Sequence, residues 1–319
     1  MLYGVKKVVK YALGTDVAGR GIAVRPSDTF LVSYPRSGNT WTRFLIANLI
    51  YPDKNVSFTN IERLIPDCEA HSSRYMKRIP GPRIIKSHEY FDHRYRRVIY
   101  IVRDPRDVVL SYYNFQRKYR QIQDDYPLAQ YVSDFVAGRL SSADWGTWGE
   151  NVGSWLVRDG EPGFLLVRYQ DLKSDPAREL SRIAGLLKIE ATAPTVATAI
   201  ERSSADRMRE MERAQGSEWV ATKNRRQDIP FVGTASSGGW KSRLPIESVA
   251  EIEAAWGHWM KRIGYALVTC SDARAIATGR ATLQESTNSI SSTARDGVAV
   301  APFGQELTRL KATALPVVP

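Results

Sequence analysis

The chain has 319 residues, of which 43% are hydrophobic and 25% charged, with a formal net charge of +11. This length can bury the core of one large α/β domain, and no apolar run approaches the ~20 residues of a membrane span. The two cysteines, Cys68 and Cys270, stand far apart, which argues against a disulfide scaffold or a cysteine zinc site and favours a reducing, cytoplasmic location. The positive charge favours anionic ligands. Because the basic residues are spread along the chain, we expect a small phosphorylated ligand and no nucleic acid.

Composition divides the chain into three expected parts. Residues 1–27 form an N-terminal extension, with a short basic amphipathic helix over 1–14 that we expect to pack on the domain. Contact with a membrane surface through this helix is the alternative. Residues 28–270 form the main domain. Residues 271–319, rich in alanine, serine and threonine, read as a mostly disordered tail.

The stretch from Thr29 to Ile50 organises the domain. Residues 29–34 are short, β-branched and aromatic, as in a buried strand, and Pro35 ends it. Apolar residues recur at helical spacing from Thr42 to Ile50. The intervening turn is polar and reads Arg36-Ser37-Gly38-Asn39-Thr40. A strand, a glycine turn and a helix N-terminus make an anion site, although an ordinary strand-to-helix turn would have the same pattern.

A second candidate segment follows at residues 83–91. Ile84 and Ile85 predict a short strand that delivers Lys86 and His88 on the same side. A single histidine is usually an unremarkable residue. Beside a phosphate loop, Lys-x-His at the carboxyl end of a parallel strand becomes a candidate catalytic pair.

The third segment begins with a clear buried strand over Val98–Val102. Asp104 then caps a helix that has Pro105 at its first position. Arg103 at the strand end and Ser111 on the helix face a common space. The alternative is a capped helix with surface charges.

The later elements follow the same alternation. We predict a strand over 164–169, a helix over 177–187, one charged helix over 196–213 and a last helix over 245–263. Residues 52–82 look irregular because of their prolines and glycine. The aromatic residues within 116–150 either cover an acceptor pocket or pack the core.

Residues 34–41 contain this polar turn and read Tyr-Pro-Arg-Ser-Gly-Asn-Thr-Trp. They resemble the 5′-phosphosulfate loop of sulfotransferases that use 3′-phosphoadenosine 5′-phosphosulfate (PAPS). In the cytosolic type that loop reads YPKSGTTW. The Lys86–His88 pair, the Arg103–Ser111 block, the strand ending at Tyr169 and the segment Gly238-Gly-Trp240-Lys241 resemble later family motifs over about 28–265. The chain thus resembles the family of PAPS-dependent sulfotransferases with a cytosolic-type domain, and we expect it to be a bacterial-type member.

This resemblance implies an α/β fold with a central parallel sheet, helices on both faces and a P-loop-like strand–loop–helix. It implies sulfuryl transfer from PAPS to a hydroxyl or amine acceptor, with His88 as general base and Arg36 and Lys86 stabilising the transferring group. No metal is implied. The residues that would hold the nucleotide are Arg36, Ser37, Gly38, Asn39, Thr40, Trp41, Arg103, Ser111, Tyr169, Ser203, Gly238 and Trp240.

The sequence departs from the family at Gly233-Thr234-Ala235, where the family has Arg-Lys-Gly next to the 3′-phosphate. Lys223, Arg225 or Arg226 are candidates to replace that charge. Two alternatives remain. One is a P-loop small-molecule kinase, although the pattern G-x-x-x-x-G-K-[ST] is absent. The other is a catalytically silent protein that binds a nucleotide or a sulfated ligand. The acceptor and the oligomeric state stay open.

Overall fold

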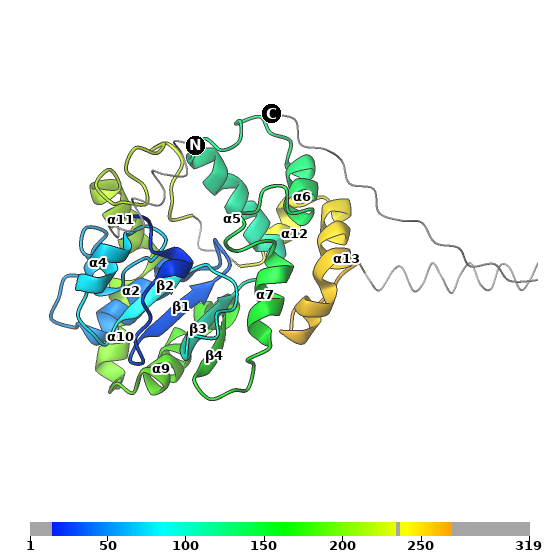
Figure 1. Cartoon of the computed structure of the whole chain (residues 1–319). Helices are drawn as coiled ribbons and strands as arrows, with labels where there is room; N and C mark the ends of the chain where they lie inside the picture. Colours follow the sequence, from blue (N-terminus) through cyan, green and yellow to red (C-terminus); the bar gives the residue numbers. More distant parts are fainter. Residues whose placement is uncertain (1–14, 234–236, 270–319) are drawn as a thin grey trace, which may run out of the picture. The chain divides into compact units, whose positions relative to one another are not determined.

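The four strands in the described part of the chain form one parallel sheet. The computed structural model describes residues 15–233 and 237–269 (Figure 1). Strands β1 (Thr29–Ser33), β2 (Ile84–Ser87), β3 (Arg97–Val102) and β4 (Phe164–Arg168) lie in the order β2-β1-β3-β4. The register pairs Val32 of β1 with Ser87 on one side and with Tyr100 on the other.

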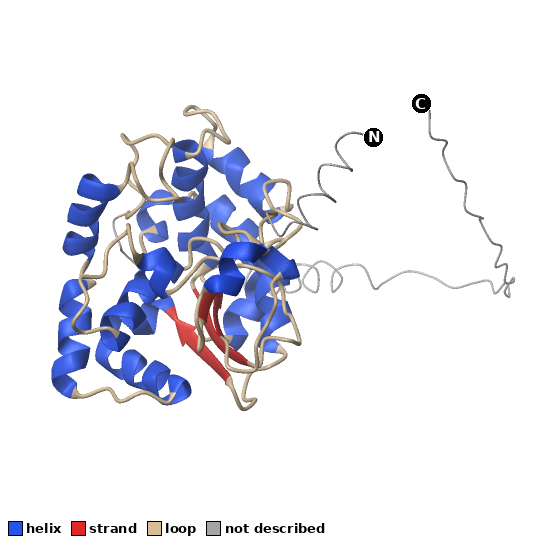
Figure 2. Ribbon diagram, turned by 60° about the vertical axis from the view of Figure 1, so that its left-hand side comes forward, coloured by secondary structure: helices blue, strands red, loops and turns tan. Residues whose placement is uncertain are grey.

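The helices surround this sheet on both faces (Figure 2). A short 3₁₀ turn, η1 (Gly19–Gly21), precedes β1. The helices in chain order are α2 (Asn39–Ile50), α3 (Ile61–Leu64), α4 (Ser73–Arg78), α5 (Pro105–Lys118), α6 (Leu128–Val136), α7 (Trp148–Leu156), α8 (Tyr169–Ser174), α9 (Pro176–Leu187), α10 (Ala193–Arg202), α11 (Ala205–Gln215), α12 (Trp240–Arg243) and α13 (Ile246–Arg262). The expected α/β fold with a central parallel sheet is confirmed.

Alternation along the strands separates two hydrophobic cores. Phe30 and Val32 of β1 pack into the core shared with α5, α6, α7 and α13. Leu31, between them, packs into the opposite core with α2, α9 and α10. Residues of β3 alternate in the same way. Since both faces are covered, the strands read as the continuous apolar runs that identified them in the sequence.

Each of the four strands ends next to a residue singled out from the sequence. The phosphate-loop candidate follows β1, His88 follows β2, Arg103 follows β3 and Tyr169 follows β4. The chain leaves β1 for a neighbour on one side and then returns to the other side for β3. A parallel sheet opens a crevice beyond the carboxyl ends of its strands at such a reversal, so this edge is where a ligand site is expected.

The strand predicted over 164–169 ends at Arg168, because Tyr169 begins α8. Two expectations about the number of helices were also wrong. The helix predicted over 196–213 is two helices, α10 and α11, which break at Ser203 and Ser204. The Ser204 side chain accepts a hydrogen bond from Arg207 N and caps α11, and serine favours this position because its oxygen replaces a missing helical acceptor. Residues 52–82, read as irregular, contain α3 and α4.

The strand–cap–helix unit at residues 98–118 is as predicted. Asp104 accepts a hydrogen bond from Arg106 N at the start of α5, with Pro105 at the first turn.

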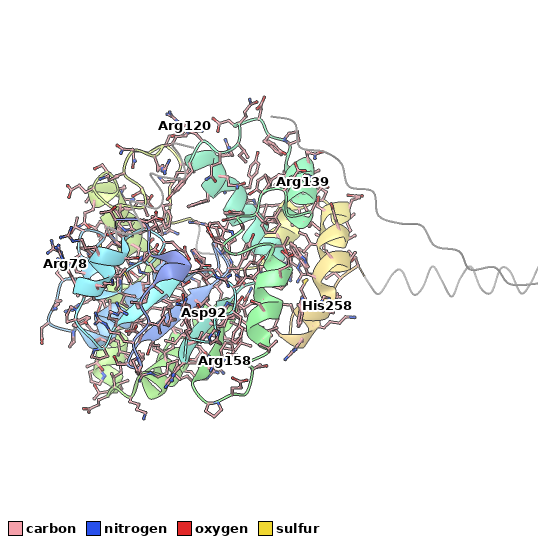
Figure 3. The ribbon with its side chains drawn as sticks, viewed as in Figure 1. Arg78, Asp92, Arg120, Arg139, Arg158 and His258 are labelled. Carbon is pink, nitrogen blue, oxygen red and sulfur yellow. The ribbon has the colours of Figure 1, made fainter. Side chains whose placement is uncertain are left out.

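Arg78, Arg120 and Arg139 are exposed at the rim of the described fold (Figure 3). The helix expected over 1–14 and the tail expected after 270 lie outside the described residues, and the domain boundaries stay predictions. None of the described helices could span a membrane.

Candidate active site

A cavity of about 1390 Å³ opens at the carboxyl edge of the sheet. Ten of the residues predicted for the site line it. They are Arg36, Gly38, Asn39, Thr40, Trp41, Lys86, His88, Arg103, Ser111 and Tyr169. Four predicted residues do not line it: Ser37, Ser203, Gly238 and Trp240. The cavity thus joins the three segments that the sequence analysis placed around one anion site.

The loop between β1 and α2 turns through two left-handed residues. Arg36 has φ 66° and Gly38 has φ 100°. A side chain at Gly38 would also collide with Tyr169, because its Cβ would lie 2.5 Å from Tyr169 Cδ2. Glycine is therefore required by both conformation and space. The expected helix over 42–50 begins three residues earlier, at Asn39, so its first N–H groups face the cavity end of the loop.

Arg36 joins the loop to two distant segments. Its Nε donates to Ser111 Oγ (3.1 Å) on α5, and one terminal nitrogen donates to the carbonyl of Phe231 (3.0 Å). The guanidinium lies beside the rings of Phe115 and Phe231, 5.1 and 4.7 Å from their centroids. Burial, and then the nearby Arg103, lower the pKa of Arg36 to about 10, so it stays charged at neutral pH.

Arg103 and Tyr169 support the loop from the neighbouring strands. One terminal nitrogen of Arg103 donates to the carbonyl of Arg36 (3.1 Å), and its guanidinium lies 4.6 Å from the Tyr169 ring centroid. Tyr169 in turn contacts Trp41 edge to face at 5.8 Å. Two arginines and a helix N-terminus thus converge on one part of the cavity, and this arrangement can bind a polyanion.

His88 is anchored by its backbone and by one ring nitrogen. Nδ1 lies 2.6 Å from the carbonyl oxygen of Ser33. The His88 N–H donates to Glu69, and its carbonyl accepts from Asn151 Nδ2 (3.0 Å). Burial, then the charge of Lys86, lower the pKa of His88 well below 6.5. A neutral imidazole with a fixed orientation can act as a general base.

Lys86 is held by two carboxylates that the sequence analysis missed. Its Nζ lies 2.7 Å from Glu69 Oε2 and 3.0 Å from Asp67 Oδ2. Burial would lower the pKa of Lys86, but Asp67 and Glu69 raise it above its ordinary value. Residues 66–68 pair with β2 through Lys86 N and O, which extends the sheet. The sequence signal for this pairing was the motif Asp67-x-Glu69, because its two acidic residues have the same spacing as Lys86 and His88.

Ser203 lies behind the wall of the cavity, where it supports the Trp41 side chain. It is fully buried, its hydroxyl accepts from Asn48 Nδ2 (3.0 Å) on α2, and its carbonyl accepts from Trp41 Nε1 (2.9 Å). It therefore orients the Trp41 indole and does not reach the cavity itself. The expected contact of Ser203 with a nucleotide stays a prediction.

The loop before α12 is held by Asp107. The N–H groups of Gly238 and Trp240 donate to its two carboxylate oxygens at 2.7 and 3.2 Å. The Trp240 ring packs under the Arg106 guanidinium, 3.8 Å from its centroid. Both residues thus position the loop, while its next residue, Gly239, lines the cavity.

The arginines proposed as substitutes for the missing family charge differ in placement. Arg225 lines the cavity, 4.5 Å from the Tyr119 ring centroid, whereas Arg226 is paired with Asp124 and Asp228. Arg209 of α11 also lines the cavity and donates to the carbonyl of Gly233 (3.2 Å). Residues 234–236 lie outside the described part. Within the described ranges, no group of three or more metal-binding side chains is found.

Comparison with known proteins identifies the class. The model of the sulfotransferase domain matches residues 26–264, and the chain belongs to this family. Sulfotransferase 1B1 of Mus musculus is 24% identical over 85% of this chain and 94% of its own length. Sulfotransferase 1E1 of Rattus norvegicus is 26% identical over 75% of this chain and 85% of its own.

A solved structure shares the fold. Mouse sulfotransferase SULT7A1 complexed with PAP superposes with a TM-score of 0.64 at 22% identity, over 76% of this chain and 87% of that one. Together with the family match, this fold places the protein among the transferases of sulfuryl groups.

Proposed function

We propose that the protein transfers a sulfuryl group from PAPS to a hydroxyl or amine of a small acceptor. The observation that carries the proposal is the position of His88. Its ring is fixed against Ser33 at the end of β1, in the same cavity as the helix N-terminus and Arg36 that follow β1. A base and an anion site therefore share one space. That SULT7A1 was crystallised with PAP supports the choice of nucleotide.

His88 takes the acceptor proton in this proposal. A carbonyl oxygen can only accept a hydrogen bond, so His88 Nδ1 carries the proton toward Ser33. Nε2 of the neutral ring then keeps its lone pair. The acceptor oxygen loses its proton to Nε2 as it attacks the sulfur, and the S–O bond to the departing phosphate breaks in line with the attack. A positioned base of this kind contributes about 10²–10⁴-fold.

Charge that develops during transfer is stabilised by the cations of the loop. Arg36 acts as an electrostatic clamp, because its pKa of about 10 leaves it protonated at neutral pH. Arg103 and the first N–H groups of α2 add donors directed at the same anion. Lys86 has three N–H donors, and Asp67 and Glu69 occupy two of them, so one remains for an oxygen of the sulfuryl group.

The test is the change in melting temperature with the product nucleotide, PAP. It is compared with ATP and AMP, each with and without EDTA. A ligand that binds only the folded state stabilises it by ~2.7 kcal/mol at a hundredfold excess over Kd. We expect a shift with PAP that needs its 3′-phosphate and is unchanged by EDTA.

Two other outcomes would replace the proposal. Stabilisation by ATP that depends on Mg²⁺ and equals that by PAP would favour a small-molecule kinase. Binding of PAP without transfer from PAPS to any phenol, alcohol or amine would favour a silent binding protein, and would contradict the role given to His88.

A further inference from the structure

The cavity has two electrically different ends. Cations surround the loop after β1: Arg36 and Arg103, joined by Lys173 over the Trp41 ring and by Arg209. At the end of His88 the lining carries four carboxylates, Asp67, Glu69, Glu89 and Asp144, together with the cations Lys86, Arg20 and Arg43. An acceptor that reaches the base at His88 must therefore enter among carboxylates.

Two of these carboxylates already have a cation. Asp67 and Glu69 share Lys86, which lies within 3.0 Å of both. Glu69 also accepts the N–H of His88, so its position is fixed next to the base. This pair of acids carries one more charge than its single lysine. Its negative charge is set against the cations that act on His88, namely Lys86, Arg36 and Arg43.

Glu89, directly after His88, is less well compensated. Its side chain is 2% exposed, and its Oε2 atom is buried without a hydrogen-bond partner. The cation beside Oε2 is Arg20 Nε at 3.2 Å, on a side chain that is 53% exposed. Burial, and then the charges of Glu69 and Asp144, raise the pKa of Glu89 to about 7. A buried carboxylate in this setting is costly unless a further cation or donor reaches it.

Aromatic side chains line the same space. The Trp145 ring lies edge to face with the His88 imidazole at 6.2 Å, and Tyr112 and Phe115 also line the cavity. Asp144 precedes Trp145 in the chain, so acid and ring reach the cavity together. These walls fit a molecule with a flat body and a charged end.

We propose that Glu89, with Glu69 and Asp144, forms a subsite for a positively charged group of the acceptor. The favoured acceptors are then hydroxyl compounds that also carry an ammonium group. This inference rests on the proposed function, since it assigns the acceptor end of the same cavity. It does not follow from the family match, which is silent on charge at this end.

The experiment compares three phenols of similar size by calorimetric titration, with and without PAP. Tyramine carries an ammonium group, 4-ethylphenol lacks it, and 3-(4-hydroxyphenyl)propionate carries a carboxylate. We expect tyramine to bind about ten- to a hundredfold more tightly than 4-ethylphenol, and the propionate to bind most weakly. Equal or tighter binding of 4-ethylphenol, or binding of none of the three, would overturn the inference.

The variant Glu89→Gln keeps the shape of the side chain and removes its charge. We expect it to lose most of the preference for tyramine, with binding of 4-ethylphenol and of PAP unchanged. Glu247→Gln, an exposed residue of α13 that does not line the cavity, is the matched control and should keep the preference. A preference that survives Glu89→Gln would refute the role of this residue.

The pH dependence supplies a test in the unaltered protein. Arg20, Glu69 and Asp144 are the charged groups that act most on Glu89, and Arg94 and the Tyr95 phenol also interact with its charge. Since Glu89 ionises as the pH rises through about 7, tyramine binding should strengthen over that interval while 4-ethylphenol binding stays constant. PAP binding, measured in parallel, tests the proposed function separately. Failure of PAP to bind would remove that function, whereas PAP binding with no preference for tyramine would remove only the acidic subsite.

Discussion

His88 Nδ1 lies 2.6 Å from the carbonyl oxygen of Ser33, the last residue of β1. This contact places the imidazole across the ends of two adjacent strands, because His88 follows β2 and β2 pairs with β1. It also selects the tautomer, since the carbonyl accepts the Nδ1 proton. The orientation of the base is thus set by the sheet and needs no ligand.

The pH profile of the reaction follows from this position. Burial, and then Lys86, lower the pKa of His88 well below 6.5, so the ring is neutral and competent as a base throughout the neutral range. As the pH falls through that lowered pKa, protonation removes the base. We expect the acidic limb of kcat/KM to fall below pH 6.5. A limb at or above this value would show that the imidazole is not desolvated as described.

Replacement of His88 separates chemistry from nucleotide binding. His88→Gln keeps a hydrogen-bond donor near Ser33 but provides no base. We expect turnover to fall by about 10²–10⁴-fold. The dissociation constant for PAP should be unchanged. His258→Gln is the control, because His258 is exposed on α13 (Figure 3) and should behave as the wild type.

Arg36 provides a test of charge against geometry. Arg36→Ala removes the cation and its contacts with Ser111 and Phe231, and we expect kcat at saturating PAPS to fall by about 10²–10³-fold. Arg36→Lys restores charge without the planar fork and should give an intermediate rate. Ser111→Ala should instead raise the KM for PAPS more than it lowers kcat. Unchanged turnover in Arg36→Ala would exclude a role for this residue in the transition state.

Gly38 and Gly185 form a matched pair of glycines. Gly38→Ala forces a residue with a side chain to φ 100° and places Cβ 2.5 Å from Tyr169, so we expect a loss of about 1–3 kcal/mol in unfolding free energy and weaker PAP binding. Gly185 lies in α9, where a Cβ would meet nothing within 4 Å, so Gly185→Ala should stabilise by about 0.5–1 kcal/mol. Urea denaturation measures both changes. Equal effects would contradict the strain assigned to the loop.

Local sequence patterns predicted the parts of the fold that depend on neighbouring residues. The strand before Pro35, the cap at Asp104 and the strand that ends just before Tyr169 are each specified by a few consecutive side chains. The helix start at Asn39 was placed three residues late, because the apolar periodicity begins only after the polar first turn. Its polar residues bind the loop and the sheet instead: Asn39 Nδ2 donates to the carbonyl of Leu31 (3.2 Å).

Contacts between distant segments were harder to predict. Asp67 and Glu69 lie in a stretch without clear periodicity, and their pairing with Lys86 depends on an edge of the sheet that forms only in the folded chain. The break at Ser203 was missed because the pattern of α10 and α11 is nearly continuous. Tertiary contacts fix the break between the two helices, because Ser203 is hydrogen-bonded to Asn48 and Trp41 across the fold.

Glu89 connects stability with pH in a direction opposite to that of most carboxylates. Its pKa in the folded chain is raised from 4.5 to about 7, so the folded state holds this proton more tightly than the unfolded state does. Its contribution to stability is complete below the unfolded pKa and is lost as the pH rises through about 7. Glutamine does not titrate. The unfolding free energy of Glu89→Gln should therefore rise by ~2–3 kcal/mol relative to that of the wild type as the pH is raised from mildly acidic to mildly alkaline.

Urea denaturation of both proteins at the two ends of this interval measures the difference. Titrating groups that do not interact with Glu89 cancel in the comparison, and the half-exposed Arg20 loses little when its partner becomes neutral. A difference between variant and wild type that does not change with pH would show that Glu89 is already ionised below the neutral range. The cost of burying its charge would then be absent, and with it the physical reason for a cation to bind there.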